Sequence, residues 1–223
     1  DEYGQYTNAM EDFLNQKDNL AKGPYISMSL PFRTSQLTRD YFKNLYLPFP
    51  PFQHQAKAYE RLSAAEPKST LVATGTGSGK TECFMNPVLD YCASEKGQGI
   101  KAIIIYPMNA LATDLAKRFA KTISSSPSLK NKVTVGLFVG QEDSEKTKVM
   151  SEDKVITCKD TLRENPPDIL MTNYKMLDFL LLRPRDQVIW KNNKADTLRF
   201  LIVDELHTFD GAQGTDLSCL IRR

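Results

Sequence analysis

A glycine-rich stretch followed by Lys-Thr is the part of this sequence best suited to chemistry. Residues 74–81 read TGTGSGKT. Glycines at alternate positions let a backbone turn tightly and direct its N–H groups at phosphate oxygens. Lys80 is then placed to reach the β- and γ-phosphates of a nucleotide, and Thr81 to hold Mg²⁺. The stretch therefore predicts a site for ATP and magnesium.

One position departs from the general phosphate-loop pattern G-x-x-x-x-G-K-[ST], because this chain has Thr74 where the pattern has glycine. The alternative interpretation is a chance glycine-rich turn. A predicted strand before the loop and a predicted helix after it argue against chance, since the N-terminus of a helix favours bound phosphate. The residues expected to contact the nucleotide here are Thr76, Gly77, Ser78, Gly79, Lys80 and Thr81.

An acidic pair follows an apolar run at residues 201–207, LIVDELH. A buried strand would deliver both carboxylates to the carboxyl edge of a sheet, where the phosphate loop also opens. We expect Asp204 to hold the hydration shell of Mg²⁺, and Glu205 to orient and deprotonate the attacking water. His207 lies in register with the acids and is expected to couple the site to the rest of the protein.

Alternating strands and helices must position these residues. Such alternation predicts an α/β fold with a mainly parallel sheet and helices on both faces. The predicted strands are 70–73, 100–106, 132–139, 168–171 and 198–204. The predicted helices are 53–65, 80–93, 109–122, 174–182 and 211–223.

The N-terminal part differs in composition from the rest of the chain. Residues 1–52 begin polar and acidic, as a short helix or ordered arm, and continue through prolines that exclude one long helix. We expect the main domain to cover 53–223 and to carry a charged, solvated insertion with one helix at 141–167. Because the chain stops just after a predicted helix, we expect it to be part of a longer protein.

Composition limits the remaining function classes. A net charge of +2 excludes a broad basic surface, so nucleic acid would be bound by a local groove and backbone amides. The cysteines lack C-x-x-C spacing, which favours reduced structural thiols. No apolar run is long enough to span a membrane and no signal peptide is visible, so we expect a cytoplasmic protein.

Taken together, these motifs resemble superfamily 2 DExH helicases. Within this superfamily, the motifs look most like the Lhr/MrfA-like group, which includes helicases of anti-phage systems such as DrmA and DruE. It covers roughly residues 20–223, and TLVATGTGSGKTE, IIIYPMNALATDLAKR, PPDILMTNYKML and DELHTFDGAQGTDLSCLIRR occur in the family's order. The resemblance implies a RecA-like phosphate-loop domain, the first of two motor domains.

Further site residues are implied by this resemblance. The segment FQHQ at 52–55 resembles the group's adenine motif, so Gln55 is expected to bond the adenine edge with Phe52 packed nearby. Three segments that follow strands resemble motifs that grip the phosphate and sugar of a nucleic-acid strand without reading its sequence. Their residues are Pro107, Asn109, Ala110, Gly140, Thr172 and Asn173.

The partners implied by the resemblance are single-stranded or partly duplex DNA, a second RecA-like domain in the same full-length chain, and proteins of a defence system. Two alternatives stay open: an RNA helicase, because phosphate contacts discriminate poorly between polymers, and an ATP-gated clamp that does not unwind. A phosphate-loop kinase or GTPase is disfavoured, because the DELH segment would have no role there and no N-K-x-D guanine signal is present.

Overall fold

The chain consists of two compact units, Asp1–Phe32 and Arg33–Arg223. The computed structural model describes residues 2–16, 31–75, 77–107, 109–140 and 146–223, and the side chains of 2–7 and 109–111 lie outside that description. The first unit contains α1 (Glu2–Asn15). The second begins earlier than the boundary at residue 53 that the sequence suggested. Phe42 and Leu47, 5% and 2% exposed, belong to its core.

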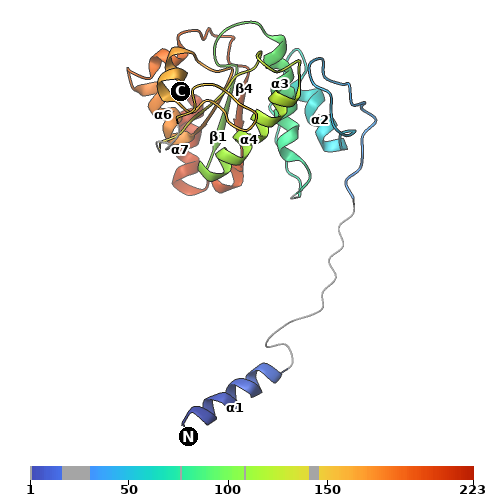
Figure 1. Cartoon of the computed structure of the whole chain (residues 1–223), viewed down its shortest axis with the longest axis vertical. Coiled ribbons are helices and arrows are strands. Elements are labelled where there is room, and N and C mark those ends of the chain that lie inside the picture. The colour runs from blue at the N-terminus through green and yellow to red at the C-terminus, as the bar shows by residue number, and fades with distance from the viewer. Residues whose placement is uncertain (1, 17–30, 76, 108, 141–145) are drawn as a thin grey trace. The chain divides into compact units, whose positions relative to one another are not determined.

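A parallel sheet of four strands forms the centre of the second unit (Figure 1). The strands are β1 (Ala102–Tyr106), β2 (Val135–Phe138), β3 (Ile169–Asn173) and β4 (Phe200–Val203). Their order is β2-β3-β1-β4, and every pairing is parallel. Because all strands run the same way, their last residues share one edge of the sheet, and that edge carries the predicted site.

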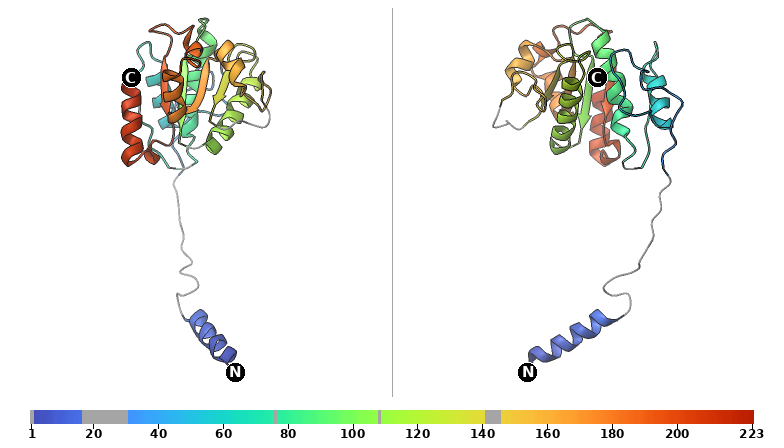
Figure 2. Two further views of the ribbon diagram at one scale, coloured as in Figure 1. Left: turned by 90° about the vertical axis from the view of Figure 1, so that its left-hand side faces the viewer. Right: turned by 45° about the vertical axis from the view of Figure 1, so that its right-hand side comes forward.

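Helices cover both faces of the sheet, as Figure 2 shows from two sides. One face packs on α3 (Lys80–Ser94) and α4 (Asn109–Ser125), and α2 (Gln53–Leu62) lies against α3. The other face packs on α5 (Lys159–Glu164), α6 (Tyr174–Leu182), α7 (Gly211–Arg222) and the short turn η1 (Gln187–Trp190). The predicted α/β class with a parallel core is confirmed.

The strand predicted at residues 70–73 is wrong. The backbone from Thr70 to Thr74 has no regular structure, and Leu71 is 78% exposed. A strand requires a hydrogen-bonding neighbour, and among the described residues none pairs with this segment. Within the described part of the chain the sheet instead ends at β4, which pairs with β1 on one side only.

The prediction of a solvated insertion at 141–167 is wrong for its second half. Val155 and Leu162 are 4% and 0% exposed, and Ile156 forms an isolated parallel bridge with Gly136 of β2. The bridge is made by hydrogen bonds from Leu137 N to Ile156 O and from Ile156 N to Val135 O. The apolar residues Val155, Ile156 and Leu162 within this charged segment were the sequence signal for that packing. The single helix expected in the insertion is α5.

Candidate nucleotide site

The phosphate loop ends in two glycines with left-handed backbone. Gly77 and Gly79 have φ values of 74° and 75°, a region that residues with a side chain rarely adopt. Gly79 is the N-cap of α3, so the helix starts at Lys80 with its N-terminal amides at the loop. A Cβ on Gly79 would lie 2.4 Å from Gln55 Nε2. The backbone conformation therefore favours glycine here, and a side chain would also displace the Gln55 amide.

Lys80 is held by the loop itself. Its Nζ donates to the carbonyls of Thr74 and Gly75 at 3.0 and 3.3 Å. The hydroxyls of Thr74 and Ser78 lie 2.6 Å apart and close the loop across its mouth. Thr74, which replaces the glycine of the general pattern, thus has a structural task. A bound phosphate would take over Lys80 from these carbonyls. Thr76 lies outside the described residues.

The start of α2 is bonded to the same loop. Gln55 Nε2 donates to Gly79 O at 3.1 Å, and Gln55 Oε1 accepts from Phe52 N at 2.9 Å. His54 Nε2 lies 2.9 Å from Ser78 O, and its ring stacks on Phe52 with centroids 5.8 Å apart. The adenine contacts of Phe52 and Gln55 stay predictions. His54 was missed, because nothing in the sequence shows that it reaches the loop.

The predicted acids lie at the carboxyl edge, directly after β4. Asp204 N donates to Ile105 O of β1 at 3.0 Å, and Asp204 Oδ1 accepts from Glu205 N at 2.9 Å. Burial raises the pKa of the Asp204 carboxyl, whereas its bond with Glu205 N and the charges of Lys80 and Arg118 lower it. Lys80 and Asp204 are therefore close enough to interact, although they are far apart in sequence. The structure thus brings the loop and the acid together.

Glu205 has a left-handed backbone, with φ of 48°. This conformation is uncommon for a residue with a side chain, and such residues concentrate at functional sites. Glu205 Oε2 lies 3.3 Å from Nδ1 of His207, whose side chain is 77% exposed. The acid predicted to activate water is thus linked to the histidine, and the histidine faces outward. That exposure is compatible with the predicted coupling role, which stays a prediction.

The residues predicted to contact nucleic acid differ in their exposure and in their hydrogen bonds. Thr172 is 0% exposed and its hydroxyl donates to Phe138 O at 2.7 Å, so this side chain is committed to the sheet. Asn173 caps α6 by accepting from Met176 N. Gly140 is exposed and Pro107 is half-buried. Asn109 and Ala110 begin α4, and their side chains lie outside the described residues.

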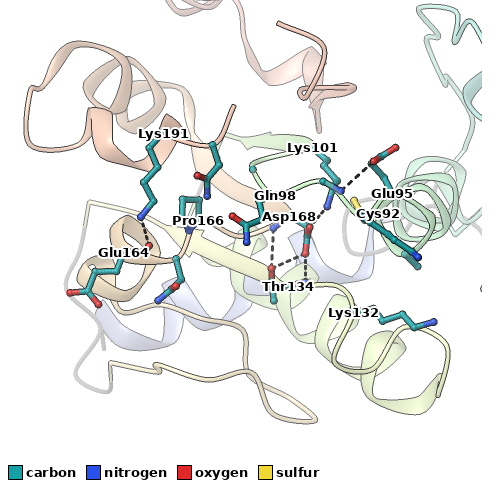
Figure 3. A pocket seen from close by; sticks show the side chains of 16 residues that line it. Cys92, Glu95, Gln98, Lys101, Lys132, Thr134, Glu164, Pro166, Asp168 and Lys191 are labelled. Atoms are coloured by element: carbon teal, nitrogen blue, oxygen red, sulfur yellow. Dashed lines mark hydrogen bonds and ion pairs between the residues drawn. The ribbon is translucent and has the colours of Figure 1, made fainter. Parts of the chain in front are cut away.

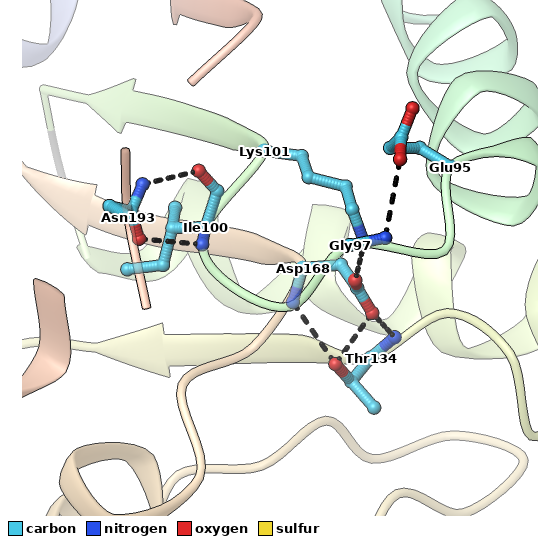
Figure 4. A network of polar contacts seen from close by, with 7 residues as sticks. All are labelled: Glu95, Gly97, Ile100, Lys101, Thr134, Asp168 and Asn193. Atoms are coloured by element: carbon cyan, nitrogen blue, oxygen red, sulfur yellow. Dashed lines mark hydrogen bonds and ion pairs between the residues drawn. The ribbon is translucent and has the colours of Figure 1, made fainter. Parts of the chain in front are cut away.

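A depression of about 780 Å³ lies at the opposite, amino edge of the sheet (Figure 3). At its base, Lys101 and Asp168 form an ion pair with side chains 4% and 14% exposed. The other Asp168 oxygen accepts from the N–H and hydroxyl of Thr134, both at 2.8 Å (Figure 4). These three residues precede β1, β3 and β2. Since their polar groups bond to one another, we interpret the network as a structural link between strand starts.

Magnesium fits the residues at the carboxyl edge. The Thr81 hydroxyl and the Asp204 carboxylate are oxygen donors, which Mg²⁺ prefers, and it is usually bound by one or two carboxylates together with nucleotide phosphates. Only one Asp204 oxygen has a hydrogen bond among the described residues, which leaves the other oxygen for a metal. No cluster of three or more His, Cys, Asp or Glu side chains suited to a metal occurs among them.

No described helix has the length and apolarity to cross a membrane.

Comparison with known proteins gives consistent results. Residues 52–223 match the profile of DEAD/DEAH box helicases. Druantia protein DruE of Escherichia coli is 24% identical, over 94% of this chain and 17% of DruE. The structure of Mycobacterium smegmatis helicase Lhr bound to ssDNA and AMP-PNP matches with a TM-score of 0.56 and 26% identity, over 77% of this chain and 20% of Lhr.

The structure of DUF1998 helicase MrfA bound to DNA matches with a TM-score of 0.58 and 24% identity, again over 77% of this chain and 20% of that one. The predicted resemblance to an Lhr/MrfA-like group close to DruE is confirmed, and so is the RecA-like fold. This chain spans about a fifth of the length of these relatives.

Proposed function

Because the chain belongs to the DEAD/DEAH box helicase family, we propose that it is the first motor domain of an ATP-dependent DNA helicase or translocase. The observation that carries the proposal is the position of Asp204 directly after β4, at the carboxyl edge of a parallel sheet, with Lys80 at the start of α3, which packs on the same sheet. Hydrolysis of a nucleotide needs at least a positively charged side chain that binds phosphate and a carboxylate that binds the metal, and both lie at this edge. The structures of two similar proteins contain bound DNA, which supports DNA as the partner.

In the proposed reaction each residue has one task. Lys80 leaves the carbonyls of Thr74 and Gly75 and neutralises the phosphates. Thr81 and Asp204 hold Mg²⁺, which supplies charge stabilisation on the transferred phosphoryl group when it is bound. Glu205 accepts the proton of the attacking water. The proposed second motor domain supplies an arginine to the transition state and, with the first, grips the DNA strand.

The test uses the full-length protein with single-stranded DNA and single-stranded RNA of equal length. DNA should stimulate ATP hydrolysis more than RNA does, and Glu205→Gln should keep nucleotide binding while abolishing turnover, since the amide keeps the shape and cannot take a proton. Lys80→Ala is the matched variant that should lose nucleotide binding itself. If Glu205→Gln hydrolysed ATP at the wild-type rate, the assignment of the water-activating base would be rejected.

The two alternatives are separated by the same assay. Stronger stimulation by RNA would identify an RNA helicase. DNA-stimulated hydrolysis with neither displacement of a labelled strand from a partly duplex substrate nor movement along single-stranded DNA would identify an ATP-gated clamp. The exposed backbone at Gly140 and the helix start at Asn109 are suited to phosphate and sugar, which both polymers contain, so the structure gives no preference of its own.

We further propose a biological role in anti-phage defence or DNA repair, with other defence proteins as partners in the former case. The likeness to DruE motivates the defence assignment. Phage plating on cells that carry the complete gene cluster tests it, with Glu205→Gln as the inactive control. Equal plating on both strains, together with sensitivity of the mutant to DNA damage, would favour repair.

A further inference from the structure

A buried tyrosine hydroxyl beside the acidic pair has no role in the reaction described so far. Tyr106 is the last residue of β1, and its side chain is 1% exposed. Its hydroxyl oxygen is buried and has no hydrogen-bond partner among the residues that the structure describes. Burying a hydroxyl without a partner is costly, and exceptions in folded proteins therefore call for an explanation. A group that arrives only with the ligand is one such explanation.

The register of the sheet places Tyr106 beside Asp204. Ile105 of β1 pairs with Val203 of β4 in parallel, so Tyr106 and Asp204 are the next pair along the two strands. Side chains of paired residues point to the same face of a sheet. Tyr106 packs on the face covered by α3 and α4, and Asp204 must therefore point to that face as well. Burial raises the pKa of the Tyr106 hydroxyl, and the Asp204 charge raises it further.

The surroundings connect this hydroxyl to the phosphate loop. Arg118 of α4 forms an ion pair with Glu82 of α3, the residue after Thr81. The Arg118 charge lowers the pKa of both Tyr106 and Asp204, so it lies near both. Asp204 Oδ1 accepts from the Glu205 amide, and the described residues give its second oxygen no hydrogen bond. A buried hydroxyl without a partner and a half-buried carboxylate with one oxygen free of described hydrogen bonds thus belong to neighbouring residues of one charged cluster.

We propose that Tyr106 is a positioning residue of the magnesium–nucleotide site: its hydroxyl donates to the Asp204 carboxylate, directly or through one water, when the metal is held there. The inference rests on the proposed function. Hydrogen bonds to an ionised carboxylate are among the strong ones, and partners of metal-binding carboxylates typically change metal affinity by about 10–100-fold. Tyr106 itself touches neither the metal nor the nucleotide.

The experiment compares the full-length wild type with Tyr106→Phe, which removes only the hydroxyl. The probe is ADP labelled on its ribose, whose fluorescence anisotropy is followed during a Mg²⁺ titration, so no hydrolysis is needed. We expect the Mg²⁺ concentration at half-saturation to rise about tenfold, the lower end of that range. The melting temperature without metal should stay equal or rise, because the variant no longer buries an unpaired hydroxyl.

Tyr59→Phe is the matched control. Tyr59 is also 1% exposed, but its hydroxyl is bonded by Asn86 Nδ2 at 3.0 Å. It should lower the melting temperature and leave the Mg²⁺ titration unchanged. A wild-type titration curve for Tyr106→Phe, or a lowered melting temperature without a shifted titration, would overturn the inference alone. A wild type whose ADP binding ignores Mg²⁺ would overturn the proposed function as well.

Discussion

The carboxylate of Asp204 is held where its own charge is disfavoured. Burial is the largest influence and raises its pKa above the ordinary 3.8, with Lys80 and Arg118 compensating in part. The folded chain therefore binds a proton at Asp204 more readily than the unfolded chain does. Stability contributed by this group falls as pH rises from 3.8 through the raised value, and the penalty is complete above that value. The ionised carboxylate, which is the form that can bind a cation, therefore lowers the stability of the fold.

Asp204→Asn tests this reasoning in the absence of nucleotide. The amide keeps the acceptor for the Glu205 N–H and removes the buried charge, so the variant should melt at the same or a higher temperature near neutral pH. Its advantage should shrink as pH falls and vanish below 3.8. The same variant should lose the Mg²⁺-dependent tightening of nucleotide binding. Thermal melts across a pH series measure the first effect; a melting temperature lowered at neutral pH would contradict it.

At the scale of the elements, the packing of α5 on β2 depends on a glycine. A Cβ on Gly136 would lie 2.4 Å from Leu162 Cδ2 and 2.9 Å from Pro167 Cγ. The glycine therefore lets α5 and the chain before β3 pack directly on the strand. This contact joins the second half of the charged insertion to the sheet.

We expect Gly136→Ala to destabilise the fold by about 1–3 kcal/mol, the usual cost of overpacking a core. Chemical denaturation monitored by circular dichroism measures the change. Gly97→Ala is the matched control, because its Cβ would meet Glu95 Oε1 at an ordinary 3.5 Å. Equal stability of the two variants would show that the packing on β2 is loose.

Whether an element could be predicted from the sequence depends on whether it is determined by neighbouring residues or by contacts between residues far apart in the chain. Four strands and the helix at Tyr174–Leu182 were predictable, because apolar runs and periodicity are local signals. The segment 70–73 has the same local signal, but a strand also needs a neighbour, which the sequence does not show. The loop and the acids were placed correctly at one edge for a topological reason. His54 and Tyr106 were missed, since their contacts come from residues distant in the chain.

At the scale of the whole molecule, the site is incomplete within this chain if the two-domain proposal holds. The loop, the acids and the proposed metal donors belong to this chain, but the arginine that stabilises the transition state would come from a second domain. Such an arginine contributes on the order of 10³–10⁵ in rate in other NTPases. Arg222 and Arg223 lie at the far end of α7, and Arg223 is paired with Asp178.

This chain alone should therefore hydrolyse ATP at least about 10³-fold more slowly than the full-length protein. It should also fail to displace a strand, because one domain cannot open and close on DNA. Steady-state turnover of both proteins, with and without single-stranded DNA, measures the difference. Comparable DNA-stimulated rates would refute the two-domain interpretation.

The one-sided pairing of β4 has a practical consequence for handling the protein. An outer strand offers unused N–H and C=O groups to any chain that approaches, and it is a common starting point for aggregation. Leu201 on β4 is 42% exposed, and no charged residue lies within Phe200–Val203 to repel a neighbour. Preparations of this chain alone should therefore lose solubility as concentration rises. A charged substitution at Leu201 should extend their shelf life without touching the nucleotide site.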